Sequence, residues 1–140
     1  MFTFQLEIIT PERIAFSDQV EMVVAPSASG IIGVLPHHEP LFTRLIEGEI
    51  KINKNGEEFY LAIGSGYMEV SGEKVVILVT SAYHADEINE QEVLAAKKRA
   101  EEALVSKPSG SALFEAQALF RRSMIALKVL HKRKGTHQIN

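Results

Sequence analysis

The stretch "EIKINKNGEEFYLAI", from Glu49 to Ile63, decides the fold class of the first part of this chain. Apolar and polar residues alternate on both sides of Asn55-Gly56, as they do in strands with one buried face. Asn-Gly is the strongest short signal for a two-residue hairpin turn, because both residues tolerate positive φ. The stretch therefore predicts an antiparallel β-hairpin. The residues expected on its buried face are Ile50, Ile52, Phe59, Leu61 and Ile63.

The same strand pattern extends over residues 1–85. "QVEMVVAP" predicts a strand that stops at Pro26, and "GYMEVSGEKVVILV" predicts a second hairpin with Ser71-Gly72 near its tip. "KVVILV" is apolar at successive positions, so we expect this strand to be buried on both faces. Near the N-terminus the residues expected on one face are Phe2, Phe4, Leu6 and Ile8. Many short strands with evenly spaced turns predict an all-β N-terminal domain, a flattened β-sandwich or barrel of about ten strands.

The pattern becomes helical over residues 86–140. Asn89 is expected to cap a first helix, with Glu92 in the third position of a capping box. "SKPSGS" breaks this helix, a second helix follows, and the tail 135–140 is expected to fray. The expected apolar stripe of the first helix is Val93, Ala96, Ala100, Ala103 and Leu104, and that of the second is Leu113, Ala116, Phe120, Met124, Leu127 and Leu130. The segment therefore predicts a C-terminal antiparallel two-helix hairpin.

The seam of this hairpin consists mostly of alanine on one side. Burial stabilises by roughly 25 cal/mol per Å² of apolar area, and alanine offers little of it. We therefore expect the hairpin to be marginal by itself and able to detach.

Composition excludes several classes of function. The chain has 46% hydrophobic and 24% charged residues, which fits a packed domain, and its lack of cysteine excludes disulfides and thiolate zinc sites. No apolar run approaches the roughly 20 residues of a membrane helix, and the N-terminus is typical of a strand and not of a signal peptide. Residues 1–85 hold 11 acidic and 5 basic residues, which argues against nucleic acid as a partner. Residues 110–134 carry Glu115 against 6 basic residues, so this segment either meets an acidic partner or is a solvated helix end.

His37, His38 and Glu39 are the most conspicuous candidates for chemistry. Consecutive side chains point in different directions, so a metal site there would need help from elsewhere, such as His84 and Asp86. The chain shows no G-x-S-x-G elbow and no Walker-A loop. A stand-alone β-sandwich metal-binding or hydrolytic protein that uses this loop is therefore the weaker alternative, and a module whose hairpin closes on a nucleotide is a third. We expect no metal and no cofactor.

The whole layout resembles the epsilon subunits of rotary F-type ATP synthases. The resemblance rests on "LEIITPERIAFSDQVEMVVAPSASGIIGVLPHHEPLFTRLIEGEI", "AIGSGYMEV", "VVILVTSAYHADEIN" and the "AAKKRAEEAL" helix. It implies a non-catalytic rotor subunit of a proton-translocating complex, peripheral on the cytoplasmic face of the bacterial inner membrane. It also implies that residues 1–85 are a foot on the gamma subunit and the c-ring, and that residues 86–140 are a regulatory hairpin that inhibits ATP hydrolysis.

The resemblance also implies site residues. The expected interface with the c-ring or gamma is Ile31, Ile32, His37, His38 and Glu39. His37 stands where the family usually has glycine, so the turn either changes its conformation or gains a polar contact. Ile31 stands where the family often has an acidic residue, and the pair of isoleucines is either an exposed apolar contact or part of the core.

The helices carry the other implied sites. The basic residues expected to inhibit, by contact with the catalytic beta subunit, are Arg121, Arg122, Lys128, Lys132, Arg133 and Lys134. Some family members bind ATP through the first helix and second-helix arginines, and the corresponding residues here are Ile88, Asn89, Glu92 and Arg122. Because Glu92 replaces an arginine and Asn89 an aspartate, we expect weak or absent ATP binding.

Overall fold

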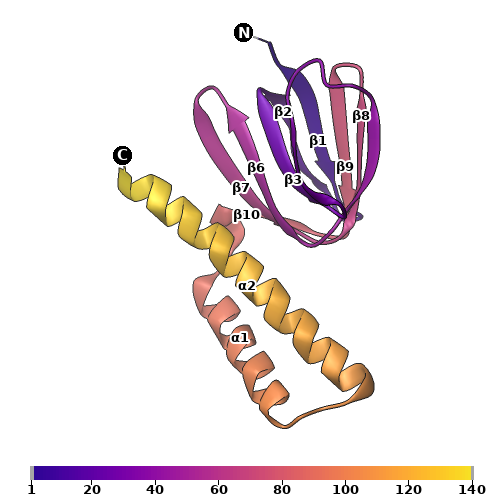
Figure 1. The fold of residues 1–140 in the computed structure, drawn as a ribbon. Coiled ribbons are helices and arrows are strands. Elements are labelled where there is room, and N and C mark those ends of the chain that lie inside the picture. Colours follow the sequence, from indigo (N-terminus) through magenta and orange to yellow (C-terminus); the bar gives the residue numbers. More distant parts are fainter. Residues whose placement is uncertain (1, 140) are drawn as a thin grey trace. The chain divides into compact units, whose positions relative to one another are not determined.

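The computed structural model describes the backbone of residues 2–139 and the side chains of residues 2–132. The chain divides into two compact units, Met1–Ala85 and Asp86–Asn140, which we call the β-unit and the helical unit. The ribbon shows the strands in the first and two helices in the second (Figure 1).

In the described part of the β-unit, ten strands form one sheet. The strands are β1 (Phe4–Ile9), β2 (Ile14–Val20), β3 (Met22–Ser27), β4 (Gly30–Val34), β5 (Leu41–Leu45), β6 (Gly48–Lys54), β7 (Glu57–Ile63), β8 (Gly66–Ser71), β9 (Lys74–Val79) and β10 (Ala82–His84). Their order is β10-β7-β6-β3-β5-β8-β9-β1-β2, and β4 pairs with β3. The pairing of β1 with β9 is parallel, and the other pairings in this part of the chain are antiparallel.

The Asn55-Gly56 hairpin is confirmed. Both turn residues have positive φ, 53° and 79°, which the right-handed twist of a two-residue hairpin requires. Strands β6 and β7 pair in the register Ile50 opposite Leu61 and Ile52 opposite Phe59. Ile50, Ile52, Leu61 and Ile63 are buried, whereas Phe59, which lies nearer the turn than Leu61 and Ile63, is 37% exposed.

The sheet curls until its two edges face each other, so the fold is a nearly closed barrel with one aliphatic core. Side chains, not a backbone ladder, join edge strand β2 and its preceding turn to β10. The His84 Nε2–H donates to the carbonyl oxygen of Ala15 at 2.6 Å, and Arg13 Nη2 donates to the carbonyl oxygen of Ala82 at 2.7 Å. These bonds satisfy edge groups that would otherwise be free to pair with another chain.

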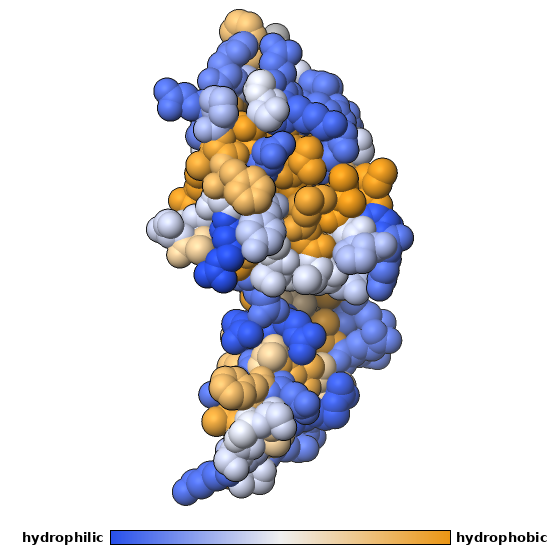
Figure 2. Space-filling view, turned by 90° about the vertical axis from the view of Figure 1, so that its right-hand side faces the viewer, coloured by the Kyte–Doolittle hydropathy of each residue, from blue (hydrophilic) through white to orange (hydrophobic). Residues whose placement is uncertain are grey.

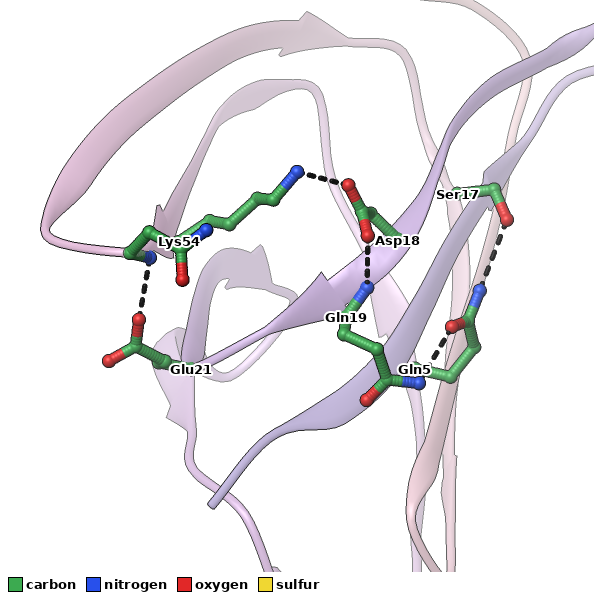
Figure 3. Close-up of polar contacts among 7 residues, drawn as sticks. Gln5, Ser17, Asp18, Gln19, Glu21 and Lys54 are labelled. Atoms are coloured by element: carbon green, nitrogen blue, oxygen red, sulfur yellow. Dashed lines mark hydrogen bonds and ion pairs between the residues drawn. The ribbon is translucent and has the colours of Figure 1, made fainter. Parts of the chain in front are cut away.

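A polar cluster ties β2 to the β6–β7 hairpin. Lys54 on β6 forms an ion pair with Asp18 on β2, and the Lys54 ammonium holds the pKa of that carboxyl below its usual value (Figure 3). Asp18 also accepts the backbone N–H of Gln19, and the Gln19 amide donates to Gln5 Oε1 at 2.9 Å. The cluster therefore links three strands at the surface of the barrel.

Three details of the strands differ from the sequence-based predictions. Strand β9 is buried on one face only, because Leu78 is 51% exposed while Val75 and Ile77 are buried. Phe2 is 74% exposed, whereas Phe4, Leu6 and Ile8 are in the core. Strand β3 continues through Pro26 to Ser27, and the Pro26 carbonyl accepts the backbone N–H of Ile46 at 2.9 Å.

The helical unit contains η1 (Ala85–Glu87), α1 (Glu90–Val105) and α2 (Gly110–Ile139). The Asn89 Oδ1 accepts the backbone N–H of Glu92 at 3.1 Å, which confirms the predicted N-cap. Lys107, in the break between the helices, and Gly110, at the start of α2, have left-handed backbones with φ of 53° and 60°. The assigned helix α2 includes most of the tail 135–140, and the expected fraying of this tail stays a prediction.

The α1 side of the seam between α1 and α2 buries a small residue, whereas α2 buries both small and large aliphatic residues. Ala100 of α1 is buried, and the buried seam residues of α2 include Ala116, Ser123 and Leu127. Met124, expected on the seam, is 44% exposed, and its neighbour Ser123 takes that place. The Ser123 hydroxyl can be buried because it donates to the Leu119 carbonyl at 2.8 Å, one turn earlier in the helix.

Candidate functional site

The five residues expected to form one interface lie toward opposite ends of strand β4. Ile31 pairs with Pro26 beside the tight turn from β3 to β4, whereas Val34 pairs with Val23 and leads into the His37 turn. A strand rises about 3.3 Å per residue, so the three steps from Ile31 to Val34 place roughly 10 Å between Ile31 and the start of the His37 turn. The structure therefore brings His37, His38 and Glu39 together but places the two isoleucines elsewhere.

The two isoleucines have different environments. Ile31 is 81% exposed, whereas Ile32 is partly buried and packs against the core of the barrel. Because neighbours in a strand face opposite sides, one points outward and the other inward. Ile31 alone is available for an apolar contact.

His37 occupies a turn that suits glycine. The backbone N–H of His38 donates to the Leu35 carbonyl at 3.2 Å, which closes a four-residue turn with Pro36 second and His37 third. His37 has a φ of 67°, as the third residue of a type II turn requires. The side chain of His37 contacts the ring of Phe2 edge to face, with centroids 5.1 Å apart. The histidine therefore keeps the left-handed backbone that glycine would adopt.

The histidines do not converge on a common point. The His38 Nδ1–H donates to the Glu39 carbonyl at 2.7 Å, while His84 is bound to Ala15 at the barrel edge. Across the described residues, no group of three or more histidine, aspartate or glutamate side chains could hold a metal ion. The metal-binding or hydrolytic alternative is therefore not favoured.

An exposed apolar stripe crosses the outside of the barrel over β5, β8, β9, β1 and β2. Tyr67 lies opposite Leu78, Leu78 opposite Ile9, and Ile9 opposite Ile14. Phe42 stacks on Tyr67 with ring centroids 5.5 Å apart. The stripe, which we call the outer apolar face, consists of Ile9, Ile14, Phe42, Tyr67 and Leu78.

The outer apolar face is the surface that the sequence-based prediction missed. Figure 2 shows a broad apolar area on the β-unit, viewed from the side on which β8 and β9 lie in Figure 1. Four members of the face are between 49% and 66% exposed, and large apolar groups gathered this way are typical of interaction surfaces. In the sequence, the apolar residues on both faces of "KVVILV" are the sign of this surface, because the strand is buried on one face and exposes Leu78 on the other.

The basic residues of α2 are divided between two places. Arg121 and Arg122 are exposed on α2, and the Arg122 Nε–H donates to the Ala118 carbonyl at 3.3 Å. Lys128 and Lys132 line a groove of about 530 Å³, together with Lys97 of α1 and His131. Met124 and Leu127 form the apolar part of this groove. Arg133 and Lys134 lie outside the residues whose side chains are described.

The four residues of the expected nucleotide site do not line that groove. Asn89 uses its Oδ1 to cap α1, and Glu92 follows within the first turn of the same helix. Arg122 lies on α2 and is bonded to its own helix backbone, and Ile88 precedes the cap. Within the described part of the chain, neither helix is long and apolar enough to cross a lipid bilayer.

Two family models match the chain in succession. The model described as the beta-sandwich domain of the ATP synthase delta/epsilon chain matches residues 3–85, and the long alpha-helix domain of the same chain matches residues 86–130. The boundary between the two matches coincides with the boundary between the two compact units.

Relatives and solved structures agree with these matches. The ATP synthase epsilon chain of Dehalococcoides mccartyi is 41% identical over 140 residues, which cover 99% of this chain and 100% of that one. The epsilon chain of Herpetosiphon aurantiacus is 43% identical over 131 residues, covering 94% and 96% of the two chains.

A chain in the mitochondrial ATP synthase of Euglena gracilis, solved as OSCP, F1 and c-ring, superposes with a TM-score of 0.68 at 19% identity, covering 96% of this chain and 81% of that one. A chain in the central stalk and c-ring of the Tetrahymena thermophila enzyme superposes with a TM-score of 0.58 at 13% identity, covering 90% and 95%. These likenesses show that the fold is shared. The domain models and the identities together establish that this chain belongs to the delta/epsilon family of ATP synthase chains, with epsilon chains as its relatives.

Proposed function

We propose that this chain is a non-catalytic rotor subunit of a proton-translocating F-type ATP synthase, peripheral on the cytoplasmic face of a bacterial inner membrane. The observation that carries the proposal is the pairing of a barrel with a large aliphatic core, which presents exposed apolar surface, with a helical hairpin that buries far fewer large apolar residues. The first suits permanent docking, and the second suits a change of conformation.

The barrel is the foot of the rotor. Its outer apolar face and the two ends of β4 are the surfaces that meet the gamma subunit and the c-ring. Because Ile31 and the His37 turn lie toward opposite ends of β4, we assign them to two different partners. The chain contains no cysteine, so Ile31→Cys and Glu39→Cys can each be cross-linked within the complex without background from the chain itself. Cross-linking of both positions to the same short segment would contradict this assignment.

The hairpin is the brake on ATP hydrolysis. Its exposed bases Arg121, Arg122 and Lys128, with Lys132, are suited to an acidic segment of the catalytic beta subunit. The two arrangements of a hairpin that acts as a switch must differ by only a few kcal/mol for a partner to bias them. The small residues of the α1–α2 seam keep the free energy of packing low enough for such a switch.

ATP hydrolysis by a rotary catalytic core stripped of its own epsilon chain tests the proposal. The full chain and a variant truncated after Ala85 are titrated in separately. We expect both to bind and only the full chain to inhibit. If neither chain binds, the proposal that the barrel docks on the rotor is wrong. If both chains bind and neither inhibits, the proposal that the hairpin inhibits ATP hydrolysis is wrong.

Nucleotide binding is expected to be weak or absent. Asn89 is engaged as the helix cap, and Glu92 would repel phosphates. Thermal unfolding with and without ATP checks this, because a ligand of the folded state stabilises by RT ln(1 + [L]/Kd). A saturable rise in the unfolding temperature would contradict the expectation.

A further inference from the structure

A hollow of about 510 Å³ lies beside the His37 turn on the surface of the barrel. Its walls come from the residues before β1, the start of β3, the end of β4 and the β6–β7 hairpin. The apolar lining consists of Phe2, Met22, Leu35 and Pro36, and the edge-to-face contact of Phe2 with His37 closes one side. Exposed Phe2 and the left-handed turn at His37 thus form one side of the hollow together.

The polar lining of the hollow is rich in acceptors. Glu21, Asn53 and Glu58 line it, and neither lysine nor arginine is among its lining residues. The Oδ1 atom of Asn53 is buried and has no hydrogen-bond partner within the described part of the chain. A buried acceptor without a donor costs about 1–3 kcal/mol, so this side of the hollow is incompletely satisfied in the chain by itself.

The Glu21 carboxylate is fixed in place by a backbone hydrogen bond. Its Oε1 accepts the backbone N–H of Asn55 at 2.6 Å, which fixes the carboxylate at the hairpin turn (Figure 3). The two lysines of β6 are engaged with other carboxylates: Lys54 pairs with Asp18, and Lys51 pairs with Glu58 at 3.8 Å. The second oxygen of Glu21 therefore has no counter-ion in the described structure.

We propose that this hollow receives an arginine side chain from a partner subunit of the rotary complex. A guanidinium presents five N–H donors in a planar fork, which suits the Glu21 carboxylate in a lining that is rich in acceptors. The methylene stem of arginine suits the walls made by Met22, Leu35 and Pro36, and the ring of Phe2 can face the cation. The proposal rests on the proposed function, because it requires a partner that docks on the barrel.

Binding of the full chain to the native rotary complex, stripped of its own copy, tests the inference. Glu21→Gln keeps an oxygen that can accept the Asn55 N–H but removes the charge, and we expect it to weaken binding about tenfold or more. Glu73→Gln is the matched control, because Glu73 is an exposed acidic residue outside the hollow, and its affinity should equal that of the unchanged chain.

A second variant does not depend on the Asn55 bond. Leu35 is 57% exposed, so Leu35→Arg should fold normally and place a guanidinium of the chain itself into the hollow. We expect it to weaken binding by a similar factor, whereas Glu73→Arg should not. Circular dichroism of each variant confirms that the barrel is intact.

The outcomes separate the inference from the proposed function. If the unchanged chain does not bind the complex, the proposed function and this inference both fail. If it binds, and Glu21→Gln and Leu35→Arg bind within twofold of it, the inference alone fails. Loss of binding in both variants, with both Glu73 controls unaffected, supports the arginine site.

Discussion

The two units of this chain bury different kinds of side chain. The β-unit has a core of large aliphatic residues, among which Leu6, Ile52 and Leu61 are completely buried. The helical unit buries fewer large side chains, and its buried residues include Ala100, Ala116, Ser123 and Leu127. Since hydrophobic stabilisation scales with the apolar area removed from water, the barrel has far more to lose from rearrangement than the hairpin. We therefore infer that the barrel keeps its structure while the helical hairpin can rearrange.

The largest expected effect comes from truncating a buried leucine to alanine in each unit and comparing the loss of stability. Leu61→Ala in the barrel should lower the free energy of unfolding by about 2–5 kcal/mol, because the surrounding core cannot fill the cavity. Leu127→Ala, on the seam of α2, should cost less, since that seam is narrow and can collapse. Urea denaturation followed by circular dichroism measures both. Equal losses would remove the physical ground for treating the hairpin as the mobile part.

Strand packing in the barrel is tested at Gly66. A Cβ at this position would lie 1.8 Å from the carbonyl oxygen of Leu78, so Gly66→Ala forces β8 and β9 apart and should cost about 1–3 kcal/mol. Gly33→Ala is the matched control, because the nearest atom to its Cβ, on Val24, is 4.0 Å away. The unfolding temperature of Gly66→Ala should be well below that of Gly33→Ala. An unchanged Gly66→Ala would mean that the barrel yields as readily as the hairpin.

The helical unit is tested at its cap. Asn89→Ala removes the acceptor for the Glu92 N–H and should destabilise the helical unit by about 1 kcal/mol. Asn89→Ser keeps a capping oxygen and should restore most of the loss. The helical signal on heating measures both variants. If Asn89→Ala and Asn89→Ser melt together, the cap is not what holds the start of α1.

The strained turn of the barrel predicts a gain in stability. His37→Gly relieves a left-handed backbone worth about 1–2 kcal/mol and adds about 0.4–1 kcal/mol of unfolded-chain entropy. The net effect should be a stabilisation of up to about 1 kcal/mol in urea denaturation. His37→Ala keeps the strained backbone and loses the Phe2 contact, so it should show no gain. A loss on His37→Gly would mean that the Phe2 contact outweighs the strain.

The smallest effect is the response to alkaline pH. Burial, with the hydrogen bond to Glu58, raises the pKa of Tyr60 to about 12. Since the unfolded phenol ionises near pH 10, the neutral form contributes stability below about pH 10, and this contribution is lost as the pH rises toward 12. Tyr60→Phe should lose less stability across this window in urea denaturation. Parallel pH profiles for the two proteins would contradict the assignment.

Local patterns predicted most of the elements because the signals were short-range. Asn55-Gly56 and Asn89 are found where the chemistry of turns and caps places them, and the helical pattern begins close to Ala85. Burial was harder to predict, because it depends on which strands become neighbours. Leu78 and Phe2 have the hydrophobicity of core residues and lie outside the core, and Ser123 displaced Met124 from the seam.

The site followed the same division. That the side chains of His37 and His38 make separate contacts was predicted from the directions of neighbouring side chains. That Ile31 lies far from this turn could not be, because the distance depends on β4 being extended between them. The outer apolar face draws its residues from five strands scattered over the first 80 residues of the chain, so no local window contains it.

Local sequence patterns suffice for the elements, the boundary between the two units and the helix cap, since each depends on residues within a few positions of one another, and similarity along the whole chain suffices for the family. The exposure of particular apolar residues, the joining of the barrel edges by His84 and Arg13, and the acidic hollow beside His37 require the folded chain. These features arise from strands distant in sequence. Their geometry is set by the register and curvature of the closed sheet, which no single segment encodes.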